Sequence, residues 1–334
     1  MGFSDLISRA NASALIPEEV YPEIIKETQE ESAVMRMAKR LPNMNRSQER
    51  LMVSSGLADA FFNDGSGADN ALAQTTSSEW ANRYIDAERI TAIIPIAKSV
   101  IADTAYDIWG QCRPQIVGAI AKLVDAAVIH GTNIPSSWST NLGETGTARA
   151  GLVARATAAS QTISLASYAD MYEALLGETD AGADGLAMLL EADGYMVSGY
   201  IAHTSVKGKL RNTRDANGQP IFHSGQQIGT SFATGFIDGA PVLYPLNGSI
   251  SAASALVVAG QWDKLVYAIR EDLTFEIGTE GVITDSGGNI IHNLWQQNMV
   301  ALKATMRLGF ALPNPINQMN ETELTRCPFA ALTA

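Results

Sequence analysis

The sequence has few cysteines, few histidines and no long apolar run. Its 334 residues include two cysteines, Cys112 and Cys327, too few and too far apart for a disulfide framework or a zinc site. We therefore expect a reducing compartment and two thiols that are either buried or unused. No stretch approaches the roughly 18 apolar residues of a membrane span, and the N-terminal residues lack the apolar core of a signal peptide. The sequence predicts a protein made in the cytoplasm, with no membrane partner.

Signatures of catalysis are missing as well. The chain contains no GxSxG nucleophile elbow, no Walker phosphate loop and no complete GxGxxG motif. Its four histidines show neither HxxxH nor HExxH spacing. These absences favour a protein that is not an enzyme and that holds no cofactor.

Positive charge is scarce too. There are 23 Lys and Arg residues against 35 Asp and Glu residues, which gives a net charge of −12. Proteins that grip nucleic acid draw most of their affinity from Lys and Arg on the phosphate backbone, so this balance argues against such a task. We expect that any nucleic acid nearby is enclosed or avoided by the protein and is not bound tightly. The 46% of hydrophobic residues indicates an ordered chain.

The clearest positive signal is a pair of strands near the C-terminus. Apolar and polar residues alternate over residues 265–277 and again over 298–310, the period of two that an extended chain requires. Glu271 is the one interruption of the apolar row in the first stretch. Residues 285–289, with the sequence DSGGN, supply turn chemistry between the two stretches. We expect two long, half-buried strands.

Residues 15–45 predict an arm and not a domain. Pro17, Pro22 and Pro42 limit any helix here to short pieces. The arm is acidic up to Met35 and basic after it, which suits docking on neighbouring subunits; a solvated surface is the other interpretation. The basic residues are Arg36, Lys39, Arg40, Arg46 and Arg50.

Residues 51–96 predict a long projecting hairpin, because strand-like ends flank a polar middle rich in Gly and Asp. A lone two-stranded hairpin is marginal in water, so it should lie on another surface. The apolar residues of the hairpin are candidates for contacts between subunits, or else for packing on their own subunit. They are Phe61, Phe62, Trp80 and Tyr84.

The periodicity becomes helical over residues 99–131, which predicts the longest helix of the chain. Asp107 is the expected N-cap and Gly131 the expected stop, while Pro114 either kinks the helix or begins its second half. The following residues 132–165 are rich in Ser, Thr and Gly and predict an extended loop with short strands.

Residues 166–262 predict a compact α+β unit. Ser167 and Asp170 resemble a capping box that opens a helix. The segments YMVSGYIAHTSV, PVLYPL and ALVVAG predict strands, and Asn217 with Gly218 predicts a tight turn.

One segment partly matches an EF-hand calcium loop. Asp180, Asp184 and Glu191 occupy ligand positions, but Gly182 and Met188 stand where two further oxygen ligands are usual. An acidic turn is therefore the better interpretation, and a calcium site is the weaker one.

The two C-terminal stretches, YAIREDLTFEIGTEG and WQQNMVALKATMRLGFALPNP, resemble the C-terminal segment of tailed-bacteriophage major capsid proteins with the Hong Kong 97-like fold. The segment LIPEEVYPEIIKETQEESAVMRMA is similar to the N-terminal arm of that family. The resemblance implies an α+β fold built from an N-terminal arm (1–48), an extended hairpin loop (49–97), a peripheral domain with a long spine helix (98–165), an axial domain (166–262), and return strands of the peripheral domain with a C-terminal tail (263–334).

The resemblance also implies a function. Members of this family close into hexamers and pentamers that form the icosahedral head shell around double-stranded DNA, so the main partner would be the chain itself. A portal protein and a separate scaffold or decoration protein would be further partners, and the protein would reside in the virion after assembly in the host cytoplasm. Some relatives join subunits by an isopeptide bond from a Lys of the extended loop. No Lys lies between Lys39 and Lys98, so we do not expect this bond here.

Two alternatives stay open. An encapsulin-type nanocompartment shell protein shares the fold but encloses an enzyme instead of DNA. A calcium-dependent binding protein would rely on the acidic loop at residues 180–191.

Overall fold

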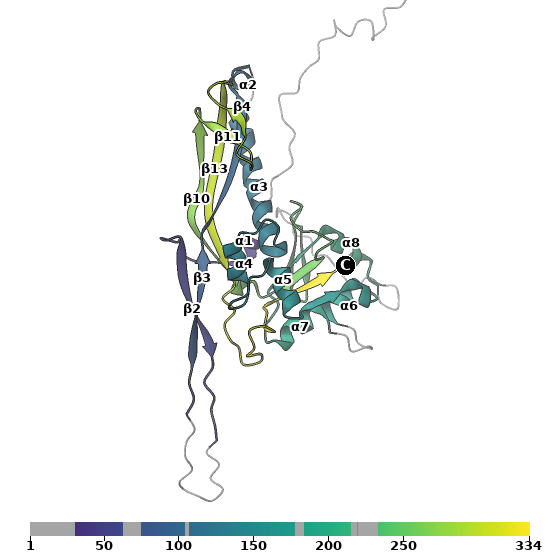
Figure 1. The fold of residues 1–334 in the computed structure, drawn as a ribbon. Coiled ribbons are helices and arrows are strands. Elements are labelled where there is room, and N and C mark those ends of the chain that lie inside the picture. The colour runs from purple at the N-terminus through teal and green to yellow at the C-terminus, as the bar shows by residue number, and fades with distance from the viewer. Residues whose placement is uncertain (1–30, 63–74, 104–106, 178–183, 215–218, 220–232) are drawn as a thin grey trace, which may run out of the picture.

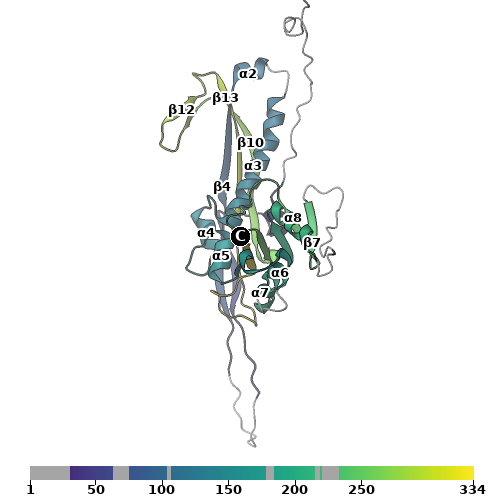
Figure 2. The same ribbon diagram turned by 90° about the vertical axis from the view of Figure 1, so that its right-hand side faces the viewer.

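The computed structural model describes residues 31–62, 75–103, 107–177, 184–214, 219 and 233–334. These residues form both helices and strands, which confirms the predicted α+β class. Two sheets make up the body, and two hairpins extend from the four-stranded side toward opposite ends of an elongated molecule (Figures 1 and 2).

The first sheet has four strands in the order β1–β10–β13–β4. Its two long strands, β10 and β13, pair antiparallel and confirm the two strands predicted near the C-terminus. Irregular pairing flanks Glu271, the residue that interrupts the apolar row. Ile277, the last apolar residue of the alternating stretch 265–277, is exposed at the end of its strand. The strands are Lys39–Arg40 (β1), Val266–Gly278 (β10), Met299–Ala311 (β13) and Glu88–Ala97 (β4).

The predicted long helix is α3 (Ile108–His130), which lies alongside this sheet and follows the shorter α2 (Lys98–Asp103) (Figures 1 and 2). Gly131 ends α3 with a left-handed φ of 71°, as its place at the stop predicted. Pro114 lies inside the helix, which continues on both sides of it. Asp107 holds the N-cap position, although its side chain makes no capping hydrogen bond.

The second sheet has six strands in the order β5–β14–β9–β6–β8–β7. Strands β8 and β9 confirm the predictions for PVLYPL and ALVVAG, whereas the predicted turn at Asn217 and Gly218 lies outside the described residues. The strands are Thr162–Ser164 (β5), Phe329–Thr333 (β14), Val257–Gly260 (β9), Gly199–Ala202 (β6), Ala240–Tyr244 (β8) and Ala233–Ile237 (β7).

Short helices pack against the six-stranded sheet through buried side chains such as Leu175, Leu190 and Leu210. The first of them begins after Asp170, so the predicted capping box is wrong, because Ser167 belongs to a separate 3₁₀ turn. The segment predicted as one strand, YMVSGYIAHTSV, is strand only in β6 and then continues into α8. The helices are Met171–Leu176 (α6), Leu186–Ala192 (α7) and Thr204–Asn212 (α8), with 3₁₀ turns at Leu165–Ser167 (η2) and Trp262–Lys264 (η3).

The stretch 132–165, predicted as extended loop, contains α4 (Ser136–Leu142) and α5 (Gly151–Ala158) in addition to the short β5. Helices of seven and eight residues are marginal in isolation. Here they are stabilised by burial of Trp138, Leu142 and Leu152.

Two further segments pair differently from the predicted division of the chain. Strand β4, expected to belong to the extended hairpin, pairs along its whole length with β13. Strand β14 lies in the segment expected to be a C-terminal tail of the peripheral domain, and it pairs with β5 and β9 in the six-stranded sheet. Long-range pairing thus decides the sheet to which each strand belongs.

One apolar core joins the two sheets. Trp138 and Tyr267 both contact the ring of Phe310, with centroid separations of 5.2 and 5.6 Å. Trp262 packs edge-on against Phe329 of β14 at 5.0 Å. Because these residues come from helices and strands on both sides, a single buried cluster connects the four-stranded and six-stranded sheets.

Candidate assembly surfaces

The projecting hairpin presents one exposed face. In the pairing of β2 (Gln48–Gly56) with β3 (Glu79–Asp86), Arg50 lies opposite Tyr84, and Ser54 lies opposite Trp80. Residues that face each other across a strand pair point to the same side. Trp80 is 72% exposed, and Met52 on the same face is 76% exposed. The structure therefore brings together three predicted assembly residues, Arg50, Trp80 and Tyr84, and adds Met52, which the sequence analysis missed.

Phe61 and Phe62 lie beyond the end of β2, and both are exposed. They precede residues 63–74, which fall outside the described part of the chain. The structure therefore separates these two predicted residues from the strand face that carries Trp80 and Tyr84.

The base of the hairpin is fixed to the body by polar contacts. Asp86 accepts hydrogen bonds from Trp138 Nε1 to its carbonyl at 3.1 Å and from Asn141 Nδ2 to its Oδ2 at 3.0 Å. Arg83 forms an ion pair with Glu323, and burial lowers the pKa of Arg83. The backbone N–H of Ile316 donates to the carbonyl of Ser54 at 3.1 Å. Contacts on both strands therefore set the direction in which the hairpin projects.

The predicted basic residues of the arm are all exposed. Lys39 and Arg40 form β1, which pairs with β10 at the edge of the four-stranded sheet. Arg40 donates to Asn43 Oδ1 at 3.1 Å, whereas Arg46 lies in the loop that leads to the hairpin. Arg36 lies one segment earlier, on α1 (Ala33–Met37). These residues line the chain path from the arm to the base of the hairpin.

A buried carboxylate anchors the arm to α3. Asp125, which is 0% exposed, accepts hydrogen bonds from Ser32 Oγ at 2.5 Å and from the N–H groups of Ala33 and Val34 at 3.1 Å. Asn247 Nδ2 donates to the same carboxyl at 3.1 Å. Burial raises the pKa of Asp125, against the opposing effect of these hydrogen bonds. The arm, α3 and the loop after β8 therefore meet at one side chain.

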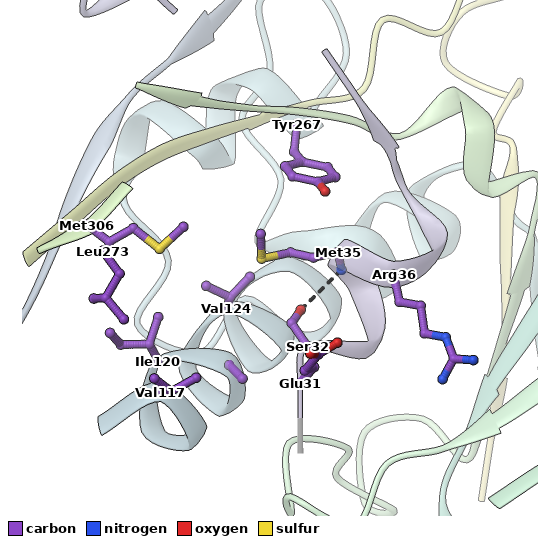
Figure 3. A pocket seen from close by; sticks show the side chains of 11 residues that line it. Glu31, Ser32, Met35, Arg36, Val117, Ile120, Val124, Tyr267, Leu273 and Met306 are labelled. Carbon is purple, nitrogen blue, oxygen red and sulfur yellow. Dashed lines mark hydrogen bonds between the residues drawn. The ribbon is translucent and has the colours of Figure 1, made fainter. Parts of the chain in front are cut away.

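Beside this anchor lies an apolar groove of about 390 Å³ between α1, α3 and the long strands (Figure 3). The hydroxyl of Ser32, at the edge of the groove, accepts a hydrogen bond from the N–H of Met35 at 3.1 Å (Figure 3). The same hydroxyl donates a hydrogen bond to Asp125. Glu31 and Arg36 add polar side chains to the lining of the groove. The apolar lining comes from Met35, Val117, Ile120, Ala121, Val124, Tyr267, Leu273 and Met306.

A second apolar surface lies at the opposite end of the molecule from the β2–β3 hairpin (Figure 2). The residues between β10 and β13, predicted only as a turn, form a small hairpin of β11 (Val282–Thr284) and β12 (Ile290–Asn293). Asp285 Oδ1 accepts from the N–H groups of Gly287 and Asn289 at 2.8 Å and fixes its turn. Trp295 is 73% exposed beside it. The adjacent apolar residues Ile290 and Ile291 were the signal that the sequence analysis passed over.

The predicted calcium loop is only partly described, because Asp180 lies outside the described residues. Asp184 and Glu191 are exposed, and Glu191 lies on α7. Within the described ranges, no three His, Cys, Asp or Glu residues lie close enough to hold a metal ion. Calcium binding stays a prediction.

Among the described residues, no helix is long and apolar enough to cross a membrane.

The fold matches solved structures of phage proteins over almost its whole length. A chain of Microbacterium phage Oxtober96 is similar with a TM-score of 0.79 and 29% identity, covering 98% of this chain and 99% of that one. A chain of Mycobacterium phage Adephagia has a TM-score of 0.78 and 24% identity, with coverage of 99% and 98%. These matches confirm the Hong Kong 97-like fold that the sequence analysis predicted.

Sequence comparison gives the same result. The major capsid protein of Staphylococcus phage 80alpha is 22% identical over 294 residues, which is 86% of this chain and 78% of that protein. The model of the phage capsid family matches residues 12–316. This protein therefore belongs to the phage capsid family.

Proposed function

We propose that the chain, as a major capsid protein, closes into hexamers and pentamers that form the icosahedral head shell of a tailed phage. The observation that carries this proposal is the exposed hairpin face with Met52, Trp80 and Tyr84. Nothing in the described part of its own copy buries this face of the hairpin, so the face gains burial only by lying on another surface. The matching surface is a second copy of the same chain.

Contacts of this kind are head-to-tail, because the hairpin of one copy lies on a different surface of the next. Such contacts repeat by rotation and close into rings. The exposed cations from Arg36 to Arg50 lie along the route from the arm to the hairpin and fit a role at the same boundary. Phe61 and Phe62, which are exposed beyond the end of β2, would contribute a separate apolar contact between copies.

The shell encloses double-stranded DNA without binding its sequence. The net charge of −12 supports this part of the proposal, since a wall of the same sign as the DNA lets it slide. A portal protein and a separate scaffold or decoration protein complete the particle, which assembles in the host cytoplasm and matures as the virion. The chain has a structural role as the building unit of the shell and catalyses no reaction.

The test is electron microscopy of the purified protein and of hairpin variants. We expect uniform particles from the unaltered chain, monomers that remain folded by circular dichroism from Trp80→Ser, and particles again from Trp80→Phe, which keeps an apolar ring. An unaltered chain that stays a monomer under all conditions contradicts the proposal. Particles that carry protein cargo and exclude DNA would instead indicate the encapsulin alternative.

A further inference from the structure

One irregular loop holds the β2–β3 hairpin at a place away from its base. The loop covers residues 312–328, between β13 and β14, and Figure 1 shows it in yellow between the hairpin and α7. On β2, the carbonyl of Ser54 accepts a hydrogen bond from the N–H of Ile316 at 3.1 Å. On β3, Arg83 forms its ion pair with Glu323. The loop therefore contacts both strands of the hairpin.

The same loop is bound to the six-stranded side of the molecule. Asn317 donates to the carbonyl of Asp193 at 2.7 Å, and Asn320 donates to the carboxylate of Asp193 at 2.9 Å. Asn314 Oδ1 accepts from the hydroxyl of Tyr195 at 2.9 Å. Asp193 and Tyr195 lie in the turn between α7 and β6. The loop thus connects the hairpin to the part of the chain that holds the six-stranded sheet.

Two buried arginines hold the loop in its conformation, although it contains neither helix nor strand. Arg326 donates to three carbonyls within the loop at 2.9 to 3.2 Å. Arg155 of α5 donates to three further carbonyls of the loop at 2.6 to 3.1 Å. A rearranged loop would leave buried donors and acceptors unpaired, which is costly. We therefore expect a stiff loop.

The attachments of the hairpin lie at different places along it. Its base is fixed at Asp86, which accepts hydrogen bonds from Trp138 and Asn141. Ser54, which binds the loop, pairs with Trp80, six residues before Asp86 on β3. At about 3.3 Å per residue, this attachment lies about 20 Å from the first. A single attachment would leave a hinge, whereas two attachments this far apart fix a direction.

We propose that the loop of residues 312–328 is a strut that fixes the angle of the hairpin, and that this angle sets the curvature of the shell. The inference rests on the proposed head-to-tail assembly, in which the hairpin of one copy lies on the next copy. Head-to-tail contacts close into rings only when the rotation from copy to copy has the required size. A hairpin that swings about Asp86 would give a range of rotations, and therefore shells of mixed size.

Arg83 and Glu323 are the positioning residues of this strut. The side chain of Arg83 is nearly buried and that of Glu323 is only partly exposed, so solvent screens the pair incompletely. Glu323 also accepts a hydrogen bond from the N–H of Thr145 at 3.0 Å, which orients its carboxylate toward the hairpin base. The contact of Ser54 with Ile316 joins backbone atoms, and substitution of either side chain leaves those atoms in place. The ion pair is therefore the part of the strut that variants can test.

Glu323→Ala and Arg83→Met each remove the ion pair. Glu276→Ala is the matched control, because it removes the exposed ion pair with Lys303, which joins β10 to β13 away from the loop. The melting temperature of every variant reports its folding. If Arg83→Met lowers it, Glu323→Ala carries the test, because Glu323 is the more exposed of the two residues.

The hairpin angle can be measured directly in the unassembled chain. Spin labels at Met52→Cys on the hairpin and at Met196→Cys on the six-stranded side report the distance between the two parts, and both positions are exposed. The background carries Cys112→Ser, whereas Cys327 is fully buried and stays unlabelled. We expect both ion-pair variants to widen the distribution of distances about twofold, while the control keeps it narrow.

Electron microscopy of the same variants, without labels, then measures the diameter of the shells. We expect mixed diameters from Glu323→Ala and one diameter from the control. A distance distribution as narrow as that of the unaltered chain overturns the inference. So does a widened distribution together with shells of one diameter, because the angle would then not set the curvature. If the unaltered chain forms no shells, the proposed function fails, whereas the label distances still decide whether the loop fixes the hairpin.

Discussion

Ser32 Oγ donates a hydrogen bond of 2.5 Å to Asp125 Oδ1, and this contact joins residues that lie 93 positions apart. The same carboxyl lies at the N-terminal end of α1, where unpaired N–H groups favour an anion. The arm therefore does not merely lie on α3. It is held there by a buried carboxyl that binds the hydroxyl of Ser32 and two N–H groups of α1.

We expect Asp125→Ala to detach the arm. The change leaves Ser32, the two N–H groups of α1 and Asn247 without their acceptor, at a cost of about 3 kcal/mol in the free energy of unfolding. Denaturant titration measures the loss, and hydrogen exchange at residues 32–35 locates it. Ser32→Ala removes only one of the donors and should cost about 1 kcal/mol. Equal losses from the two variants would show that Asp125 is not the centre of the anchor.

The same carboxyl gives a pH dependence whose sign is fixed. Because burial raises the pKa of Asp125, the folded chain keeps its proton at a pH where the unfolded chain has released it. Its contribution to the free energy of unfolding is therefore largest at low pH, and it decreases as pH rises from the ordinary value of 3.8 through the raised pKa. Asp125→Asn should abolish this decrease when stability is measured from pH 3 upward. An unchanged slope in that variant would assign the effect to another group.

His130 should act in the opposite direction. Its Nε2 accepts a hydrogen bond from the N–H of Ser251 at 3.0 Å, and burial lowers its pKa below the ordinary 6.5. The folded chain then prefers the neutral ring, so stability is lost as pH falls below 6.5. Denaturation at pH 7.5 and 5.5 should show a larger loss for the unaltered chain than for His130→Gln, which cannot gain the proton. Identical losses would contradict this assignment.

Arg155 should be far more important than its neighbour Arg149, although both bind Glu144. Arg155 is 1% exposed and also donates to the carbonyls of Glu323, Leu324 and Arg326 at 2.6 to 3.1 Å. Arg155→Met leaves these carbonyls unpaired and should lower the free energy of unfolding by about 3–5 kcal/mol. Arg149→Met, at a side chain that is 30% exposed, should cost about 1 kcal/mol or less. Similar costs for the two variants would contradict the role of Arg155 in holding the C-terminal loop.

Two glycines with nearly the same backbone conformation should respond differently to alanine. Gly151 has a φ of 85°, and a Cβ there would meet the carbonyls of Val128 and Ile129 at 2.8 Å. Gly146 has a φ of 81° and open space around it. We expect Gly146→Ala to cost about 1–2 kcal/mol from backbone strain alone. Gly151→Ala should cost clearly more, or abolish folding, in the same thermal melt. Equal costs would mean that the backbone at Gly151 relaxes away from α3.

The assembly residues stay a prediction, and the structure adds only their placement. The aromatic residues of the hairpin and the basic residues of the arm were identified by residue type and position. The sequence did not show that these residues share one face of the hairpin. Their shared face follows from the register of β2 with β3, which places Arg50, Trp80 and Tyr84 on the same side. The anchor at Asp125 gave no signal in the sequence. A single acid in a helical pattern is indistinguishable from a solvated one until the arm is seen to cover it.

The sequence by itself determined the elements whose pattern is long and local: the two C-terminal strands, the long helix and its stop at Gly131, the projecting hairpin, and the family. It did so because periodicity, turn residues and charge balance are properties of neighbouring residues. Only the tertiary structure decided that β4 and β14 belong to different sheets, that residues 132–165 contain helices, and that Ser32 meets Asp125. Short elements are stable only through burial against distant partners, and those partners are chosen by the fold as a whole.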